Sequence, residues 1–181
     1  MTPAGRRIQP SRQRRAFTLV ELVTVLAIIG IVAAIAAPRY INSIVRYRVD
    51  ASARRVAADL SYAQGRARAA SAGCTVSFNS AAASYTIIGA ADPIARNATY
   101  VVALGDEPYR SKIQSMDLGG DSQVVFDGYG MPDADGVIIV RAGGMRKAIQ
   151  IKAETGQIEV AEVTPAFLLD VADRGLTVSV E

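Results

Sequence analysis

The spacing of apolar positions changes twice along the chain, and the first stretch is the most regular. Residues 17–37 form a run of 21 positions in which Glu21 is the only charged residue. A helix rises 1.5 Å per residue, so a helix of this length spans about 30 Å, which matches the hydrocarbon core of a bilayer. The pattern therefore predicts a transmembrane helix over residues 17–37.

Between residues 38 and 73 the apolar positions recur every three or four residues, which is typical of an amphipathic helix. We interpret this stretch as a continuation of the first helix, loosened or kinked at Pro38 and ended by Gly73. Charged residues such as Asp50 and Asp59 occupy the remaining surface, which we expect to be solvated. The apolar face is expected to comprise Ile41, Val45, Val49, Ala53, Val56, Leu60, Ala63, Ala67 and Ala70.

After Gly73 the apolar residues recur at every second position, and no helical pattern follows that would connect parallel strands. We therefore expect an α+β fold, in which an antiparallel sheet over residues 74–161 buries one face on the long helix and leaves the other in water. Residues 162–181 form an extension without an assigned role, in which Leu176–Val180 is expected to add an edge strand. The expected strands are Thr75–Asn79, Ser84–Ile88, Tyr100–Leu104, Gln123–Phe126, Val137–Arg141, Ala148–Lys152 and Gln157–Val160.

Composition excludes several kinds of chemistry. The chain has no histidine and one cysteine, Cys74, so it has neither a histidine triad nor a zinc site built from several Cys or His ligands. An intramolecular disulfide is excluded too, and we interpret Cys74 as a small buried thiol. The pair Ser111-Lys112 has no supporting motif around it. We predict that the protein is not an enzyme and needs no cofactor.

Charge is concentrated at the N-terminus. Residues 1–16 contain five arginines and no acid, and the rest of the chain carries 15 Lys and Arg against 17 Asp and Glu, a formal charge of −2. Without the first segment the chain has no general attraction for nucleic acid, which we therefore do not predict as a partner. The basic flank favours a cytoplasmic N-terminus with the bulk of the chain on the other side of the membrane.

The junction of these two segments, Ala16-Phe17-Thr18-Leu19-Val20-Glu21, resembles the cleavage and methylation motif of type IV pilins and type II secretion pseudopilins. The resemblance implies that a prepilin peptidase removes residues 1–16 by cutting between Ala16 and Phe17, and methylates the new amino group of Phe17. It also implies that Glu21 is the assembly carboxylate. The family usually has glycine before the cut, where this chain has Ala16.

A charge inside a membrane span is costly, which indicates a function for Glu21. A plain membrane anchor explains the apolar run but leaves Glu21 unexplained. The resemblance supplies a partner, because the cationic amine of Phe17 on a neighbouring subunit can pair with this carboxylate and partly offset the cost of both charges.

Later segments resemble those of H-type minor pseudopilins, in particular Phe126-Asp127-Gly128-Tyr129-Gly130 and the turn Thr155-Gly156. The resemblance implies a single-pass inner-membrane protein with its globular domain in the periplasm. It would be a minor subunit of the short type II secretion pseudopilus that moves folded proteins across the outer membrane. Its partners would be other pseudopilins, the prepilin peptidase and the inner-membrane assembly platform. The alternative is a minor type IV pilus subunit that serves adhesion, motility or DNA uptake.

Two further segments are candidate binding sites. Asp127, Asp133 and Asp135 bring three carboxylates into ten residues, which makes them candidate calcium ligands, although a wide turn explains the same composition. Some minor pilins of this domain type bind DNA through a Gly-Arg-x-Arg motif near the last hairpin. The matching stretch, Gly156-Gln157-Ile158-Glu159, lacks both arginines, which argues against DNA capture.

Overall fold

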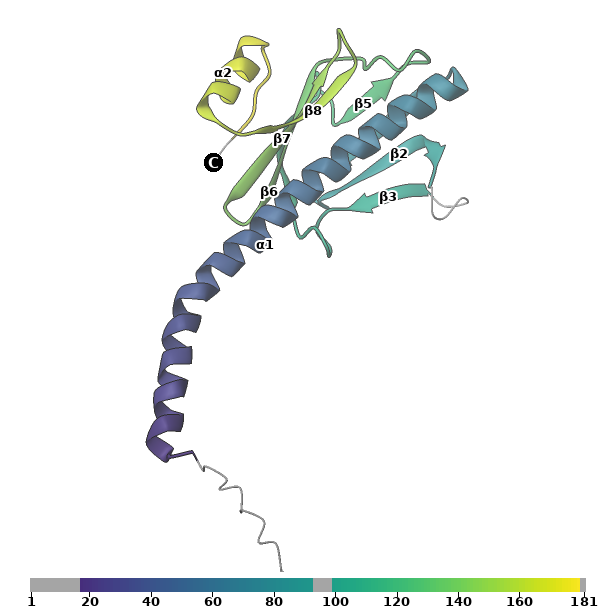
Figure 1. Cartoon of the computed structure of the whole chain (residues 1–181). Coiled ribbons are helices and arrows are strands. Elements are labelled where there is room, and N and C mark those ends of the chain that lie inside the picture. The colour runs from purple at the N-terminus through teal and green to yellow at the C-terminus, as the bar shows by residue number, and fades with distance from the viewer. Residues whose placement is uncertain (1–16, 93–98, 180–181) are drawn as a thin grey trace, which may run out of the picture. The chain divides into compact units, whose positions relative to one another are not determined.

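The computed structural model describes residues 17–92 and 99–179, and divides into two compact units, Met1–Tyr40 and Ile41–Glu181. The first unit contains the beginning of the long helix α1, and the second contains the rest of α1 and all of the strands (Figure 1). The elements in chain order are α1 (Leu19–Ala70), β1 (Cys74–Asn79), β2 (Ser84–Ala91), β3 (Thr99–Ala103), β4 (Lys112–Asp117), β5 (Gln123–Phe126), β6 (Gly136–Ala142), β7 (Met145–Lys152), β8 (Gln157–Glu162) and α2 (Pro165–Asp173).

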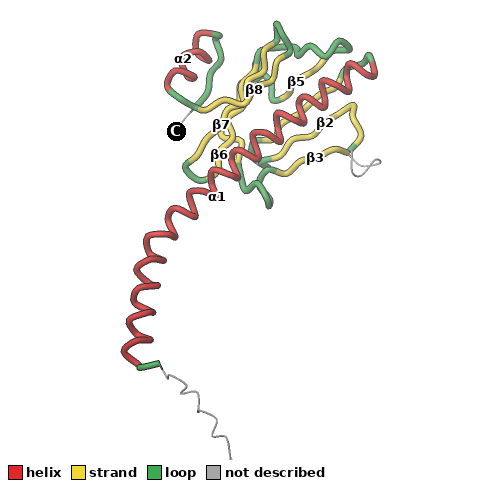
Figure 2. The backbone as a smooth tube through the Cα atoms, viewed as in Figure 1, coloured by secondary structure: helices red, strands yellow, loops and turns green. Residues whose placement is uncertain are grey.

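The strands form two four-stranded antiparallel sheets rather than the single sheet that we expected. Their orders are β3-β2-β1-β5 and β4-β6-β7-β8. The predicted hairpin of β1 and β2 is confirmed, with Thr75 opposite Ile88. Figure 2 shows strands on both sides of the C-terminal part of α1. All seven predicted strands are confirmed with small shifts of their ends, and β4 is an eighth strand that the sequence analysis missed.

The core of the second unit forms where both sheets meet α1. Six of the nine residues predicted for the apolar helix face are buried, whereas Val45 is half-buried and Ile41 and Ala70 are exposed. Because alanine side chains are small, the alanines of this face let the strands approach the helix backbone closely. The buried helix residues are Val49, Ala53, Val56, Leu60, Ala63 and Ala67.

Helix α1 ends earlier than predicted and by a different residue. Ser71 adopts a left-handed conformation, with φ at 49°, and its N–H donates to the carbonyl of Arg68 at 3.2 Å. The N–H of Ala72 donates to the carbonyl of Ala67, also at 3.2 Å, which completes a Schellman motif. The prediction that Gly73 ends the helix was therefore wrong, because Ser71 already satisfies the last carbonyls.

The C-terminal extension forms a helix, α2, and not the predicted edge strand; no strand is present over the described residues 176–179. Thr164 caps α2 by accepting a hydrogen bond from the N–H of Phe167 at 3.2 Å, and Pro165 occupies a first-turn position that favours proline. Phe167 and Val171 are buried against the second sheet, where they meet Val137, Ile139 and Ala148. The expectation of a solvated outer face was therefore wrong for this sheet.

The segment after α2 is tied to β4 by a carboxylate. Asp117 Oδ2 accepts hydrogen bonds from the N–H of Thr177 at 2.7 Å and from its hydroxyl at 3.1 Å. The backbone N–H of Thr177 contributes most to holding the pKa of Asp117 below its ordinary value. A lowered pKa stabilises the folded state at higher pH, and this contribution is lost as the pH falls through the folded-state pKa.

We therefore expect the Thr177 contact to persist through about pH 4, the ordinary range of an aspartate, and to weaken only at lower pH. The measurement is the amide NMR shift of Thr177 against pH. Asp117→Asn should abolish the acid transition, whereas Asp173→Asn, which changes an exposed aspartate of α2, should leave it intact. An unchanged Thr177 titration in Asp117→Asn would contradict this assignment.

Candidate functional site

The N-terminal end of α1 carries a helix cap. The N–H of Glu21 donates to Thr18 Oγ1 at 3.1 Å, and the N–H of Leu22 donates to the carbonyl of Thr18, also at 3.1 Å. Threonine at the cap with glutamate three residues later is the sequence of a capping box. The carboxylate also lies in the first turn, where the helix dipole favours negative charge. This local role of Thr18 and Glu21 was readable from the sequence and was missed there.

The side chains that surround Glu21 have no cover within the protein. Every residue from 17 to 37 is exposed, and Phe17 retains 78% of its accessible surface. Twelve large apolar side chains are exposed in this stretch, a far larger apolar surface than a soluble monomer normally presents. Among the described residues, α1 is the one helix long and apolar enough to cross a membrane. This segment therefore needs lipid or other helices around it.

The residue before the predicted cut, Ala16, and the rest of the basic segment 1–16 lie outside the described residues. Phe17 and Thr18 precede the first residue of α1 and have no regular secondary structure.

The three candidate calcium ligands each cap a different piece of backbone. Asp127 Oδ1 accepts from the N–H of Tyr129 at 2.9 Å and of Met131 at 2.8 Å. Asp133 Oδ1 accepts a hydrogen bond from the N–H of Val125, and Asp135 Oδ1 accepts one from the N–H of Ala153. Within residues 17–92 and 99–179 no three carboxylates, thiols or imidazoles gather into a group suited to a metal ion. Each of the three carboxylates thus accepts backbone N–H groups, which is a common local role of aspartates in turns.

A buried carboxylate on α1, Asp59, was wrongly placed on the solvated face. Its oxygens accept hydrogen bonds from the hydroxyl of Tyr85 at 2.5 Å, from the hydroxyl of Tyr100 at 2.8 Å and from Arg55 Nε at 2.9 Å. Arg55 also donates to the hydroxyl of Tyr100 at 2.6 Å. We call these four residues the Asp59 cluster.

The Asp59 cluster perturbs the ionisation of its members. Burial, followed by the charge of Asp59, raises the pKa of Tyr85 well above its usual range. Burial and the hydrogen bond to Asp59 raise the pKa of Tyr100 to about 12. Burial is the largest single effect on the pKa of Arg55 and lowers it, but the charge and hydrogen bond of Asp59 and the two nearby tyrosines together raise it by more, so the pKa rises. Both tyrosines therefore remain neutral donors at physiological pH, and the cluster joins α1 to β2 and β3.

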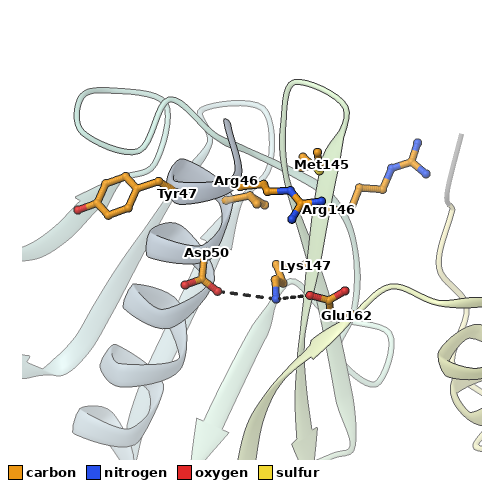
Figure 3. Close-up of a pocket in the computed structure, with 8 residues that line it drawn as sticks. Arg46, Tyr47, Asp50, Met145, Arg146, Lys147 and Glu162 are labelled. Atoms are coloured by element: carbon orange, nitrogen blue, oxygen red, sulfur yellow. Dashed lines mark hydrogen bonds and ion pairs between the residues drawn. The ribbon is translucent and has the colours of Figure 1, made fainter. Parts of the chain in front are cut away.

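A second ionic group connects α1 with β7 and β8 (Figure 3). Lys147 Nζ lies 2.9 Å from Glu162 Oε1 and 3.7 Å from Asp50 Oδ1. They border a pocket of about 340 Å³ that Arg46 and Tyr47 also line. The hydrogen bond from Lys147 lowers the pKa of Glu162. Both carboxylates engage the lysine. This ionic group therefore links α1 to β7 and β8 and is not arranged for acid–base chemistry.

The last hairpin offers little positive charge to a nucleic acid. Lys152 Nζ lies 3.4 Å from Glu159 Oε2, and the Gln157 side chain donates to Glu159 Oε1 at 2.5 Å. Lys147, on strand β7 of the same hairpin, is held by Glu162 and Asp50. Carboxylates at these positions repel phosphate.

The comparisons agree with the N-terminal site. Residues 11–37 match the model of the prokaryotic N-terminal methylation motif. The matched segment includes Phe17, Thr18 and Glu21. No curated protein matches the chain. Among solved structures, the type IV minor pilin FimU of Pseudomonas aeruginosa is 13% identical, with 64% of this chain and 89% of that chain covered and a TM-score of 0.48. The minor pseudopilin EpsH from the Type 2 Secretion System of Vibrio cholerae is 12% identical, with 64% and 97% covered and a TM-score of 0.49.

The chain thus has the N-terminal segment of a type IV pilin-like protein, a class that includes pilins and pseudopilins. That segment continues into a long helix, which is followed by an antiparallel two-sheet domain. The methylation motif predicted from Ala16 to Glu21 lies within the matched segment.

Proposed function

We propose that this protein is a filament subunit that is processed at the bond between Ala16 and Phe17, held in the inner membrane by the beginning of α1, and then assembled with other subunits. One observation carries the proposal: Glu21 lies one helical turn beyond Phe17 in a segment whose side chains are all exposed. Such a segment is covered by lipid before assembly and by neighbouring helices afterwards. The carboxylate remains in both surroundings and requires a partner.

In this proposal, cleavage and assembly are coupled through charge. Cutting before Phe17 creates a cationic amine at the end of an apolar helix. When subunits are staggered along a filament, the amine of one chain reaches Glu21 of its neighbour, and each ion offsets part of the desolvation cost of the other. The rest of α1 continues the helix as far as Ala70, strands β1 to β8 supply the sheet domain, and α2 extends it.

Among filaments, we infer a minor pseudopilin of the type II secretion system, located with its sheet domain in the periplasm. Its partners would be other pseudopilins and the inner-membrane assembly platform, and nucleic acid would not be among them. The hairpin supports this choice over a DNA-binding minor pilin, because Glu159 and Gln157 stand where arginines would be needed and Glu159 pairs with Lys152. The alternative remains a minor type IV pilus subunit that serves adhesion or motility.

Processing tests the proposal most directly. In cells with an active prepilin peptidase, intact-mass spectrometry should find a chain that begins at Phe17 and carries one added methyl group. Cells without the peptidase should retain residues 1–16, and Ala16→Gly should be cut at least as fast as the wild type. A mature chain that begins upstream of Phe17 in peptidase-positive cells would overturn the proposal.

The two kinds of filament are separated by the phenotype of a deletion. Loss of folded proteins from the medium would support the pseudopilus, as would neighbouring genes for a secretin and a secretion ATPase. Loss of surface motility or adhesion with normal secretion would support the pilus. Tight, salt-sensitive DNA binding by the full chain would favour DNA uptake instead.

A further inference from the structure

The two sheets have four edges, and three of them are partly covered or carry charges. At β5, the N–H of Val125 donates to Asp133 Oδ1 and its carbonyl accepts from the N–H of Asp133, both at 3.0 Å. At β4, Thr177 is bound by Asp117. At β8, Glu159 and Glu162 place charges on the edge, a common protection against unwanted strand pairing. The edges of these strands are therefore covered or charged.

The fourth edge, β3, has none of these protections in the described part of the chain. Its five residues, Thr99–Ala103, include no charged residue and no proline. Figure 1 shows β3 at the outer margin of its sheet. Val101 points away from the core and keeps 53% of its surface exposed. An uncharged edge rich in β-branched and aromatic residues is a template for an added strand.

The register of the β2–β3 pair shows which backbone groups face outward. The N–H of Leu104 donates to the carbonyl of Ala83 at 2.7 Å, and Tyr85 is opposite Val102 in the same register. Because bonded and non-bonded pairs alternate in an antiparallel ladder, Tyr100 and Val102 bond to β2. The N–H and C=O groups of Val101 and Ala103 then point to the open edge.

This edge borders a groove of about 510 Å³ that runs along Tyr100–Ala103. Arg55 of α1 and Tyr109 of the following loop form its other walls, and Asp92 also lines it. Arg55 is fixed by Asp59 and by the Tyr100 hydroxyl, so its charge is already compensated. The groove thus combines open backbone groups with mainly apolar and aromatic walls.

We propose that the β3 groove binds one extended segment of another protein, which pairs with β3 as an added strand. The segment would have apolar side chains at alternate positions, facing the groove, because a strand presents every second residue to one face. A single strand fits better than a second copy of this chain. Two copies paired through β3 would bring both Arg55 side chains and both Tyr109 rings into one groove. This binding is independent of filament assembly.

The probe is a synthetic heptapeptide of alternating valine and threonine flanked by lysines, labelled and titrated into the full chain in detergent micelles. We expect saturable binding by fluorescence anisotropy, with slower amide hydrogen exchange at Val101 and Ala103 and little change at Tyr100 and Val102. The same peptide with N-methyl groups on its pairing edge should not bind. Absence of saturable binding, equal binding of the methylated peptide, or unchanged exchange at Val101 and Ala103 would overturn the proposal.

Two proline variants test the edge in the protein. Val101→Pro and Ala103→Pro each remove an outward N–H without touching the ladder to β2, which makes them tolerable at an edge. Each is expected to weaken peptide binding at least tenfold, while Val101→Thr, which keeps the N–H, binds like the wild type. Thermal unfolding verifies that the variants are folded. Unaltered binding by both folded proline variants would refute the assignment, as would self-association through β3 that Val101→Pro abolishes.

Discussion

Asp59→Ala is expected to lower the free energy of unfolding by about 3 kcal/mol, because it leaves two buried tyrosine hydroxyls without an acceptor and Arg55 without its counter-charge. Asp59 retains 6% of its surface and accepts from Tyr85, Tyr100 and Arg55. Arg55 remains partly exposed and can regain water, so the loss should lie at the lower end of the range for broken buried ion pairs. Urea unfolding of the full chain in detergent, followed by circular dichroism, measures it.

The matched control is Asp50→Ala, on the same helix. Asp50 retains 37% of its surface, pairs with Arg54 at 2.8 Å and lies 3.7 Å from Lys147 Nζ, so the loss of these partly exposed contacts should change the stability by less than about 1 kcal/mol. Asp59→Asn, which keeps an acceptor but removes the charge, should fall between the two. A double-mutant cycle of Asp59→Asn with Tyr85→Phe should give a coupling of at least about 0.5 kcal/mol. Equal effects of Asp50→Ala and Asp59→Ala would disprove a special role for the cluster.

Most elements could be located from the sequence because their apolar residues recur at regular intervals. Strand β4 was missed because its alternation of apolar and polar residues is interrupted. In β4 the register shifts between Ile113 and Ser115 opposite β6, so the alternation of apolar and polar residues fails within the strand. Such an irregularity is decided by the partner strand and cannot be recognised from β4 alone. Whether the strands form one sheet or two likewise depends on which strands pair. The local pattern of the sequence does not contain that information.

Other errors had a readable signal. Asp59 lies three residues after Val56 and four before Ala63, both on the predicted apolar face, so its burial followed from the same helical period. Its partners Tyr85 and Tyr100 are distant in sequence and could not be identified. The run Val137-Ile138-Ile139-Val140 is apolar at consecutive positions, which indicates a strand covered on both faces. That pattern required a cover such as α2 on the outer face.

The N-terminal site is a prediction from sequence, possible because its residues are consecutive and their spacing carries the chemistry. A single chain places Phe17, Thr18 and Glu21 at the start of α1, but the proposed partner of Glu21 belongs to another subunit. The structure adds the cap at Thr18. That cap gives Glu21 a second role, in helix initiation, which an experiment on assembly must separate from pairing with a neighbour.

Glu21→Val should reduce incorporation of the protein into filaments on the order of tenfold or more, while membrane insertion continues, because the amine of a neighbouring Phe17 then lacks its counter-charge in an apolar surrounding. Glu21→Gln should assemble nearly as poorly, since it keeps the reach and acceptor of a capping residue but not the charge. Thr18→Ala removes the cap and keeps the carboxylate, so it should assemble nearly normally. Incorporation is measured by immunoblotting of sheared filaments against membrane fractions, with intact mass to verify processing. If Thr18→Ala assembled as poorly as Glu21→Val, or if Glu21→Gln assembled like the wild type, helix capping rather than charge pairing would account for Glu21.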